Sequence, residues 1–213
     1  MLKTIAWKEL RELLPIIITA FALQFFVICS VVGISPKYQV LPQDLHAVVT
    51  LLMFESGLLA IALGLWQNMA EQNQGTFLFL FHRPWRRESI VAAKLLIGVS
   101  VCLLVGSLPI AGFALWADAR AEHATALPDD IWSAAWPVGF CLVLLYLGAF
   151  MSSLRAATWY KSRYLPLFCG IALFALLAAL AHSREFTVLV ATPLIAFGFV
   201  VGILYEAMTR DFS

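Results

Sequence analysis

Six long apolar runs, separated by short polar connectors, constrain the fold of this chain more than any other feature. An α-helix needs about 20 consecutive apolar residues to cross the hydrocarbon core of a bilayer. Of the 213 residues, 62% are hydrophobic and 13% are charged, whereas a soluble domain is about half apolar and a quarter charged. We therefore predict an all-α, polytopic membrane protein with a single domain, residues 1–213. The predicted spans cover residues 15–34, 47–69, 89–116, 132–153, 164–181 and 186–208.

Lysine and arginine are distributed unevenly between alternate connectors. With the N-terminus in the cytoplasm, only Lys37, Arg120 and Arg184 of the 14 basic residues fall on the outer side. Such a bias marks the cytoplasmic side of membrane proteins, so we expect a multi-pass membrane protein with both termini in the cytoplasm. The net charge of +1 gives no reason to expect a nucleic-acid partner. The cytoplasmic set is Lys3, Lys8, Arg11, Arg83, Arg86, Arg87, Lys94, Arg155, Lys161, Arg163 and Arg210.

Residues 2–14 place apolar side chains at helical spacing opposite a charged face that consists of Lys3, Lys8, Glu9, Arg11 and Glu12. Lys8 and Glu12 lie four residues apart, and Trp7 suits the headgroup zone. We predict an amphipathic interfacial helix over residues 1–14, which bends at Pro15 into the first span. The alternative is a plain charged extension of that span.

The connector over residues 71–88 is the most charged segment between two long apolar runs. It opens with Glu71 and amides, passes through a Gly-Thr step and an apolar stretch, and ends with a proline and a basic pair. We predict a short amphipathic helix and turn on the cytoplasmic face, where a partner protein can dock. The alternative is a cytoplasmic loop without a partner. The residues expected to matter are Glu71, Gly75, Thr76, Phe81, Pro84, Arg86 and Arg87.

This connector resembles that of the transmembrane permease subunits of ABC-2 type ABC transporters. In that family a Glu, polar residues, Gly-Thr or Gly-Ser, an apolar run, Pro, a basic pair and an early Lys in the next span follow in this order. Glu71, Gly75-Thr76, Pro84, Arg86-Arg87 and Lys94 stand in those places. The resemblance implies six spans, an N-terminal elbow helix, and a coupling helix at residues 71–88 that contacts a separate ATPase subunit.

The resemblance also implies an exporter in the bacterial inner membrane, whose substrate path is formed with a second copy of the chain or a related permease. ATP and Mg²⁺ would be bound by the ATPase subunit. The chain departs from many members of the family at one point. Only four polar residues, 182–185, separate the last two apolar runs, so the outer hairpin common there is absent or lies within those runs.

Glu55 is the one ionisable residue deep inside a predicted span, roughly 12 Å from its outer edge at 1.5 Å per residue. A charge at that depth must be paired, neutralised or turned toward a cavity. Glu55 is therefore either a substrate or proton site, or a neutral acid that joins helices by a hydrogen bond, with Gln24 as the expected partner. We expect Lys94 to extend to the cytoplasmic surface.

The sequence contains no nucleotide-binding loop of the G-x-x-x-x-G-K-[ST] type and no nucleophile elbow. Its four cysteines form no C-x-x-C pair and its four histidines lack metal-ligand spacing, so we expect no metal site and no cofactor in this chain. The leading interpretation is a membrane subunit that is not itself an enzyme. Two alternatives remain: a non-transporting substrate-binding or sensor subunit, and an intramembrane enzyme that uses Glu55.

Overall fold

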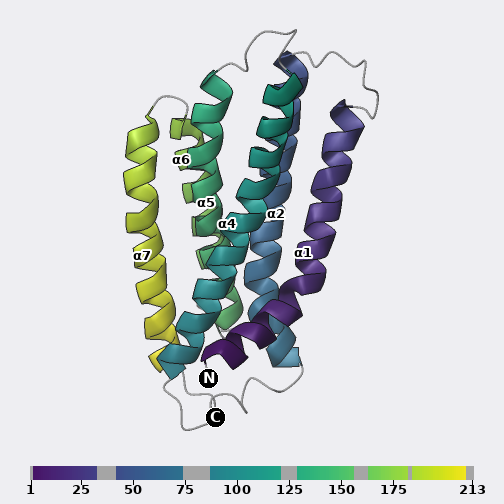
Figure 1. Ribbon diagram of the computed structural model, residues 1–213. Helices are drawn as coiled ribbons and strands as arrows, with labels where there is room; N and C mark the ends of the chain where they lie inside the picture. The colour runs from purple at the N-terminus through teal and green to yellow at the C-terminus, as the bar shows by residue number, and fades with distance from the viewer. Residues whose placement is uncertain are drawn as a thin grey trace.

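Every regular element in the described part of the chain is an α-helix, which confirms the all-α prediction (Figure 1). The computed structural model describes residues 2–32, 42–73, 87–120, 129–155, 163–181 and 184–209. The helices are α1 (Leu2–Val32), α2 (Pro42–Asn73), α4 (Arg87–Arg120), α5 (Asp129–Leu154), α6 (Leu165–Ala181) and α7 (Glu185–Thr209).

Five of these helices are long and apolar enough to cross a membrane, so the chain is a multi-pass membrane protein. Their apolar segments agree with the predicted spans to within a few residues, apart from an earlier start in the first. The sixth helix, α6, has 17 residues and is only about 25 Å long. A sixth span therefore stays a prediction. The five segments are Trp7–Ser30, Ala47–Met69, Glu88–Phe113, Trp136–Leu154 and Glu185–Thr209.

The helices run alternately up and down, and α5 lies at the centre of the bundle (Figure 1). It packs against α2, α4, α6 and α7, and its residues from 141 to 150 are almost all buried. Helix α1 packs against α2 and α4 at one edge. As Figure 1 shows, α1 begins, α2 ends, α4 begins and α7 ends at the same end of the bundle, which we call the connector end.

Helix α1 is continuous from Leu2 to Val32 although Pro15 lies inside it. Proline has no backbone N–H and bends a helix without always ending it, and the first turns of α1 run obliquely across the connector end before the helix rises along the bundle (Figure 1). The separate interfacial helix predicted for residues 1–14 is not confirmed. One part of that prediction is wrong: Glu9 does not belong to an exposed charged face, because it is only 1% exposed.

Helices α2 and α5 approach closely where Gly64 faces the α5 backbone. A methyl group at Gly64 would lie 2.8 Å from the backbone nitrogen of Phe150 and 2.8 Å from the Cβ of Ala149. Small residues permit such close contact between membrane helices, where van der Waals packing supplies much of the attraction. Small residues also allow α5 and α6 to pack closely, since the Cα atoms of Gly148 and Gly170 face each other.

Gly64→Ala should lower the free energy of unfolding by about 1–3 kcal/mol, because the added methyl overlaps backbone atoms that have no room to move. Gly112→Ala is the matched control, since a methyl at Gly112 meets nothing within 4 Å. The measurement is unfolding of the purified protein in mixed micelles by increasing amounts of dodecyl sulfate. Equal midpoints for the two variants would contradict the close packing of α2 on α5.

The charge distribution predicts that the connectors at the two ends of the bundle face opposite sides of the membrane. Single cysteines at Arg86 and Glu122, introduced after the four native cysteines are replaced, should react with an impermeant maleimide from opposite sides of sealed vesicles. A third cysteine at His182 should behave like the one at Glu122 if α6 spans. Labelling of positions 86 and 122 from the same side would exclude the predicted topology.

Candidate functional site

A buried polar cluster joins four helices at the connector end. Its members are Glu9 of α1, Gln67 of α2, Lys94 of α4 and Tyr146 of α5, and none of the four is more than 3% exposed. They lie within otherwise apolar helices, where an unpaired charge or amide costs several kcal/mol. The cluster is therefore the place where this bundle departs most from simple apolar packing.

The four side chains bind one another in a closed arrangement. Lys94 Nζ lies 3.1 Å from Glu9 Oε1, and Gln67 Nε2 donates to Glu9 Oε2 at 3.1 Å and to the Lys94 carbonyl at 3.0 Å. The Tyr146 hydroxyl donates to Gln67 Oε1 at 2.8 Å. Lys94 Nζ also reaches the backbone oxygen of Gln67 at 3.4 Å. Gln67 thus uses both its donors and its acceptor, which is what a buried amide requires.

Gly98 makes room for the cluster. It lies one helical turn after Lys94 on α4, and a methyl group there would overlap the hydroxyl of Tyr146. The glycine therefore allows the Tyr146 ring to lie against α4 with its hydroxyl directed to Gln67. The ring of Tyr146 also packs on that of Phe150, with centroids 5.9 Å apart.

A second set of polar contacts reinforces the α2–α5 contact one residue further along α2. Asn68 Nδ2 donates to Ser153 Oγ at 2.8 Å. The Ser153 hydroxyl in turn lies 3.2 Å from the carbonyl of Gly64 and 2.7 Å from that of Phe150. Interhelical hydrogen bonds of this kind are each worth about 0.6 kcal/mol in a membrane. Together with the Tyr146–Gln67 hydrogen bond they fix the register of α2 against α5.

Two residues of the cluster lie close in sequence to the two ends of the 71–88 connector. Gln67 is six residues before the end of α2 at Asn73, and Lys94 is seven residues after the start of α4 at Arg87, which corresponds to roughly 9–11 Å of helix. Because Gln67 and Lys94 bind each other, the two helices that carry the connector are tied together just inside it. Glu9 and Tyr146 extend these contacts to α1 and α5.

Most of the connector residues named above lie outside the described residues, so their predicted role is untested. This holds for Gly75, Thr76, Phe81, Pro84 and Arg86. Glu71 belongs to the last turn of α2 and Arg87 is the first residue of α4. The structure therefore shows the two helical supports of the connector.

The expectation for Lys94 is wrong. Its ammonium does not extend to the surface; it is buried and paired with Glu9, because a carboxylate on a neighbouring helix satisfies it more directly than distant water does. A signal for this was present in the sequence. Glu9 is in helical phase with Leu13 and Ala20, and Lys94 with Val101, all of which are buried. Opposite charges on two buried faces indicate a pair.

Gln24 and Glu55, the predicted intramembrane pair, are not bonded to each other. Gln24 Nε2 donates to Ser56 Oγ and to the carbonyl of Val105, both at 3.2 Å. Gln24 therefore joins α1 to α2 and α4, with partners other than the expected one. Within the described chain, both carboxyl oxygens of Glu55 are covered and have no hydrogen-bond partner.

Glu55 borders a groove of about 450 Å³ between α1 and α2. The groove opens to the outside of the bundle, since Leu23, Leu58 and Trp66 in its wall are each about half exposed. Apart from Glu55, the described lining contains one hydroxyl, that of Thr19, which donates to the Pro15 carbonyl at 2.8 Å. The lining residues are Pro15, Ile16, Thr19, Ala20, Leu23, Glu55, Leu58, Leu59, Ala62 and Trp66.

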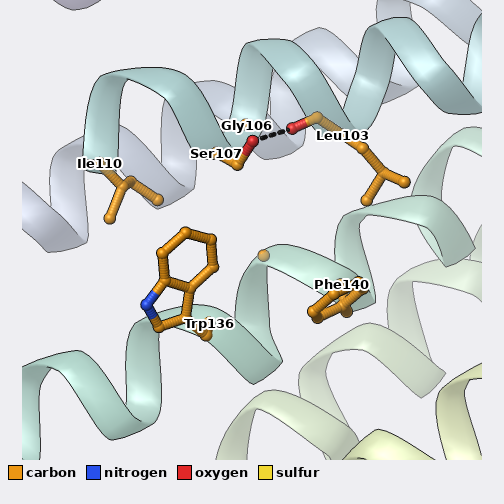
Figure 2. Close-up of a pocket in the computed structure, with 7 residues that line it drawn as sticks. Leu103, Gly106, Ser107, Ile110, Trp136 and Phe140 are labelled. Atoms are coloured by element: carbon orange, nitrogen blue, oxygen red, sulfur yellow. Dashed lines mark hydrogen bonds between the residues drawn. The ribbon is translucent and has the colours of Figure 1, made fainter. Parts of the chain in front are cut away.

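A smaller pocket of about 230 Å³ lies between α4 and α5. Figure 2 shows the Trp136 ring beside Ile110, with Phe140 on the same helix. The Ser107 hydroxyl at its upper side donates to the Leu103 carbonyl at 2.6 Å. None of the described lining residues is ionisable and the one side-chain hydroxyl among them is already bonded, so we assign this pocket no function.

In the described part of the chain, no group of three or more His, Cys, Asp or Glu side chains could hold a metal ion. Comparison with family models, with curated proteins and with solved structures finds no match to this chain. The buried cluster and the Glu55 groove are therefore the two features of the structure that bear on function.

Removing one partner of the Glu9–Lys94 pair should destabilise the protein by about 3–5 kcal/mol, because the other charge is left buried and uncompensated. Glu9→Gln and Lys94→Met should each show this loss, and the double variant should lose clearly less than the sum. The half-exposed Lys8–Glu12 pair, 3.6 Å apart, is the control and should contribute under about 0.5 kcal/mol. Unfolding in mixed micelles measures the three variants at Glu9 and Lys94 beside the corresponding single and double variants at Lys8 and Glu12, and additive losses at Glu9 and Lys94 would contradict the pairing.

Proposed function

We propose that this chain is the transmembrane permease subunit of an ATP-driven exporter of the ABC-2 type, coupled to a separate ATPase subunit. The single observation that carries the proposal is the ordered pattern from Glu71 to Lys94, which resembles the coupling connector of that family. The multi-pass bundle supports it, because a translocation path needs several spans. In this proposal two copies, or one copy and a related permease, form the path in a bacterial inner membrane with both termini in the cytoplasm.

The buried cluster supplies the physical connection that such a function requires. A coupling helix can transmit force only if the spans on either side of it move as a unit. Gln67 and Lys94 join α2 to α4 within about two turns of the connector, and Glu9 and Tyr146 extend the connection to α1 and α5. ATP binding would close the ATPase pair, displace the connector and shift these four helices together. The change of access then follows from the different affinity of the ATPase for the two states.

A non-transporting binding subunit is the second candidate. The groove beside Glu55 favours it, because a groove with one unpartnered carboxyl is suited to binding whether or not transport follows. An intramembrane enzyme is less well supported. The described lining of the groove offers Glu55 as the only ionisable group, and acid–base catalysis usually needs a second group to complete proton transfer.

Partner capture tests the proposal directly. The tagged chain, purified from its native host in mild detergent, should bring down a protein with ATPase activity. A photo-crosslinker at Trp85 should attach to that ATPase, whereas the same crosslinker at Glu122, predicted to be on the other side, should not. Absence of any ATPase, or crosslinks from Glu122 alone, would remove the exporter proposal.

Fit at the connector should matter more than charge, because an exposed charge pair is worth only about 0–1 kcal/mol. Gly75→Leu, or a bulkier residue than Phe at position 81, should abolish the dependence of ATP hydrolysis on the membrane subunit while the chain still inserts and folds. Arg86→Ala should change the rate by less than about threefold. Gly112→Leu is the control for a bulky substitution elsewhere. The measurement is the ATPase rate of the purified complex beside its elution profile; unchanged rates in the position-75 and position-81 variants would show that the connector is not a coupling element.

A further inference from the structure

The Glu55 groove differs from the buried cluster in one respect that suggests a ligand. At the connector end, the Glu9 carboxylate has an ammonium 3.1 Å away and an amide donor at 3.1 Å. In the middle of the α2 span, the Glu55 carboxyl has no donor from the described chain. The same bundle thus contains one carboxyl with its cation and one without.

A carboxyl in that position requires compensation. Ionisable groups inside membrane spans mark ion or substrate pathways more often than they serve structure alone, because an uncompensated charge there costs several kcal/mol. The structural alternative would be a hydrogen bond to a neighbouring helix. Gln24, the nearest candidate from the sequence, directs its amide donors to Ser56 and Val105 instead. The described chain therefore gives Glu55 no hydrogen-bond partner, which leaves its carboxyl to be neutralised by a proton or paired with a cation from outside.

The walls of the groove define what such a cation must look like. They are apolar on both helices, from Leu23 on α1 to Leu58 on α2. The hydroxyl of Thr19 already donates its proton to the Pro15 carbonyl. A hydrated inorganic ion or a sugar would lose hydrogen bonds to water that these walls cannot replace. An anion would meet the carboxylate. A volume of about 450 Å³ falls within the range of pockets that hold small organic ligands.

We propose that the groove between α1 and α2 binds a hydrophobic organic cation, such as an amphiphilic amine, with Glu55 as its counterion. The ligand reaches the groove from the bilayer, since Leu23, Leu58 and Trp66 in its wall are exposed on the outside of the bundle. An opposite charge within about 4–6 Å favours the charged form of a carboxyl, so apolar contact fills the groove while Glu55, whose oxygens are covered, selects the sign of the ligand. As a substrate class the inference rests on the proposed function, whereas binding needs no ATPase.

Binding of tetraphenylphosphonium to the purified chain in detergent tests this inference. The probe is a hydrophobic cation, and tetraphenylborate carries the same four phenyl groups with the opposite charge. Equilibrium dialysis should show saturable binding of the phosphonium that the borate does not displace. Glu55→Gln keeps the side-chain shape and should weaken binding at least about tenfold. Glu206→Gln, a carboxyl near the end of α7, is the matched control and should bind as the wild type does.

Leu58→Trp tests the groove without touching the charge. The larger side chain should occupy the space and abolish saturable binding, whereas Leu194→Trp on the exposed face of α7 should not; both leucines are more than half exposed. If Glu55→Gln fails to fold, the Leu58→Trp result and the borate comparison still show whether the groove binds a hydrophobic cation. No saturable binding, equal binding by Glu55→Gln, or equal displacement by the borate would each overturn the inference. Charge-dependent binding by a chain that captures no ATPase would support the cation site and contradict the proposed exporter function.

Discussion

A buried ion pair in an apolar bundle joins α1 to α4, and hydrogen bonds of Gln67 and Tyr146 extend the connection to α2 and α5. Glu9 and Lys94 cannot remain apart once α1 and α4 pack, because each would leave a charge buried without compensation. Gln67 and Tyr146 complete the arrangement by satisfying the remaining oxygens and donors. In lipid, apolar side chains gain little from one helix neighbour over another. Polar contacts of this kind therefore select which faces meet, and the glycines at 64 and 98 allow the backbones to come close enough.

Much of the fold follows from the sequence because hydrophobic length is a direct physical signal. The run predicted as 89–116 became α4, Arg87–Arg120, and the run predicted as 186–208 became α7, Glu185–Thr209. The limits of that signal are equally physical. Pro15 removes one backbone donor, and whether the helix bends or ends there depends on packing that the sequence does not display. The 17 residues of α6 lie at the lower limit of length for a span.

The site was predicted less completely, for a reason that Lys94 illustrates. A lysine in an apolar run can either extend to the surface or pair with a buried acid, and the choice depends on a residue far away in the chain. Glu9 was in phase with buried Leu13, yet its charged neighbours Lys8 and Glu12 favoured an exposed face. Gln24 was predicted to bond Glu55, whereas its amide donates to Ser56 and to the carbonyl of Val105. Glu55 was recognised because a carboxyl at that depth is rare whatever surrounds it.

The distance along the chain between Glu9 and Lys94 also has a consequence for biosynthesis. The pair joins position 9 to position 94, and at 5–20 residues per second the ribosome needs roughly 4–17 s to make the chain between them. During that interval Glu9 has no lysine partner on α4, and its carboxylate is most stable in water. The oblique first turns of α1 can therefore reach their final place only after α4 has entered the membrane. Packing of the first turns of α1 therefore follows the insertion of α4.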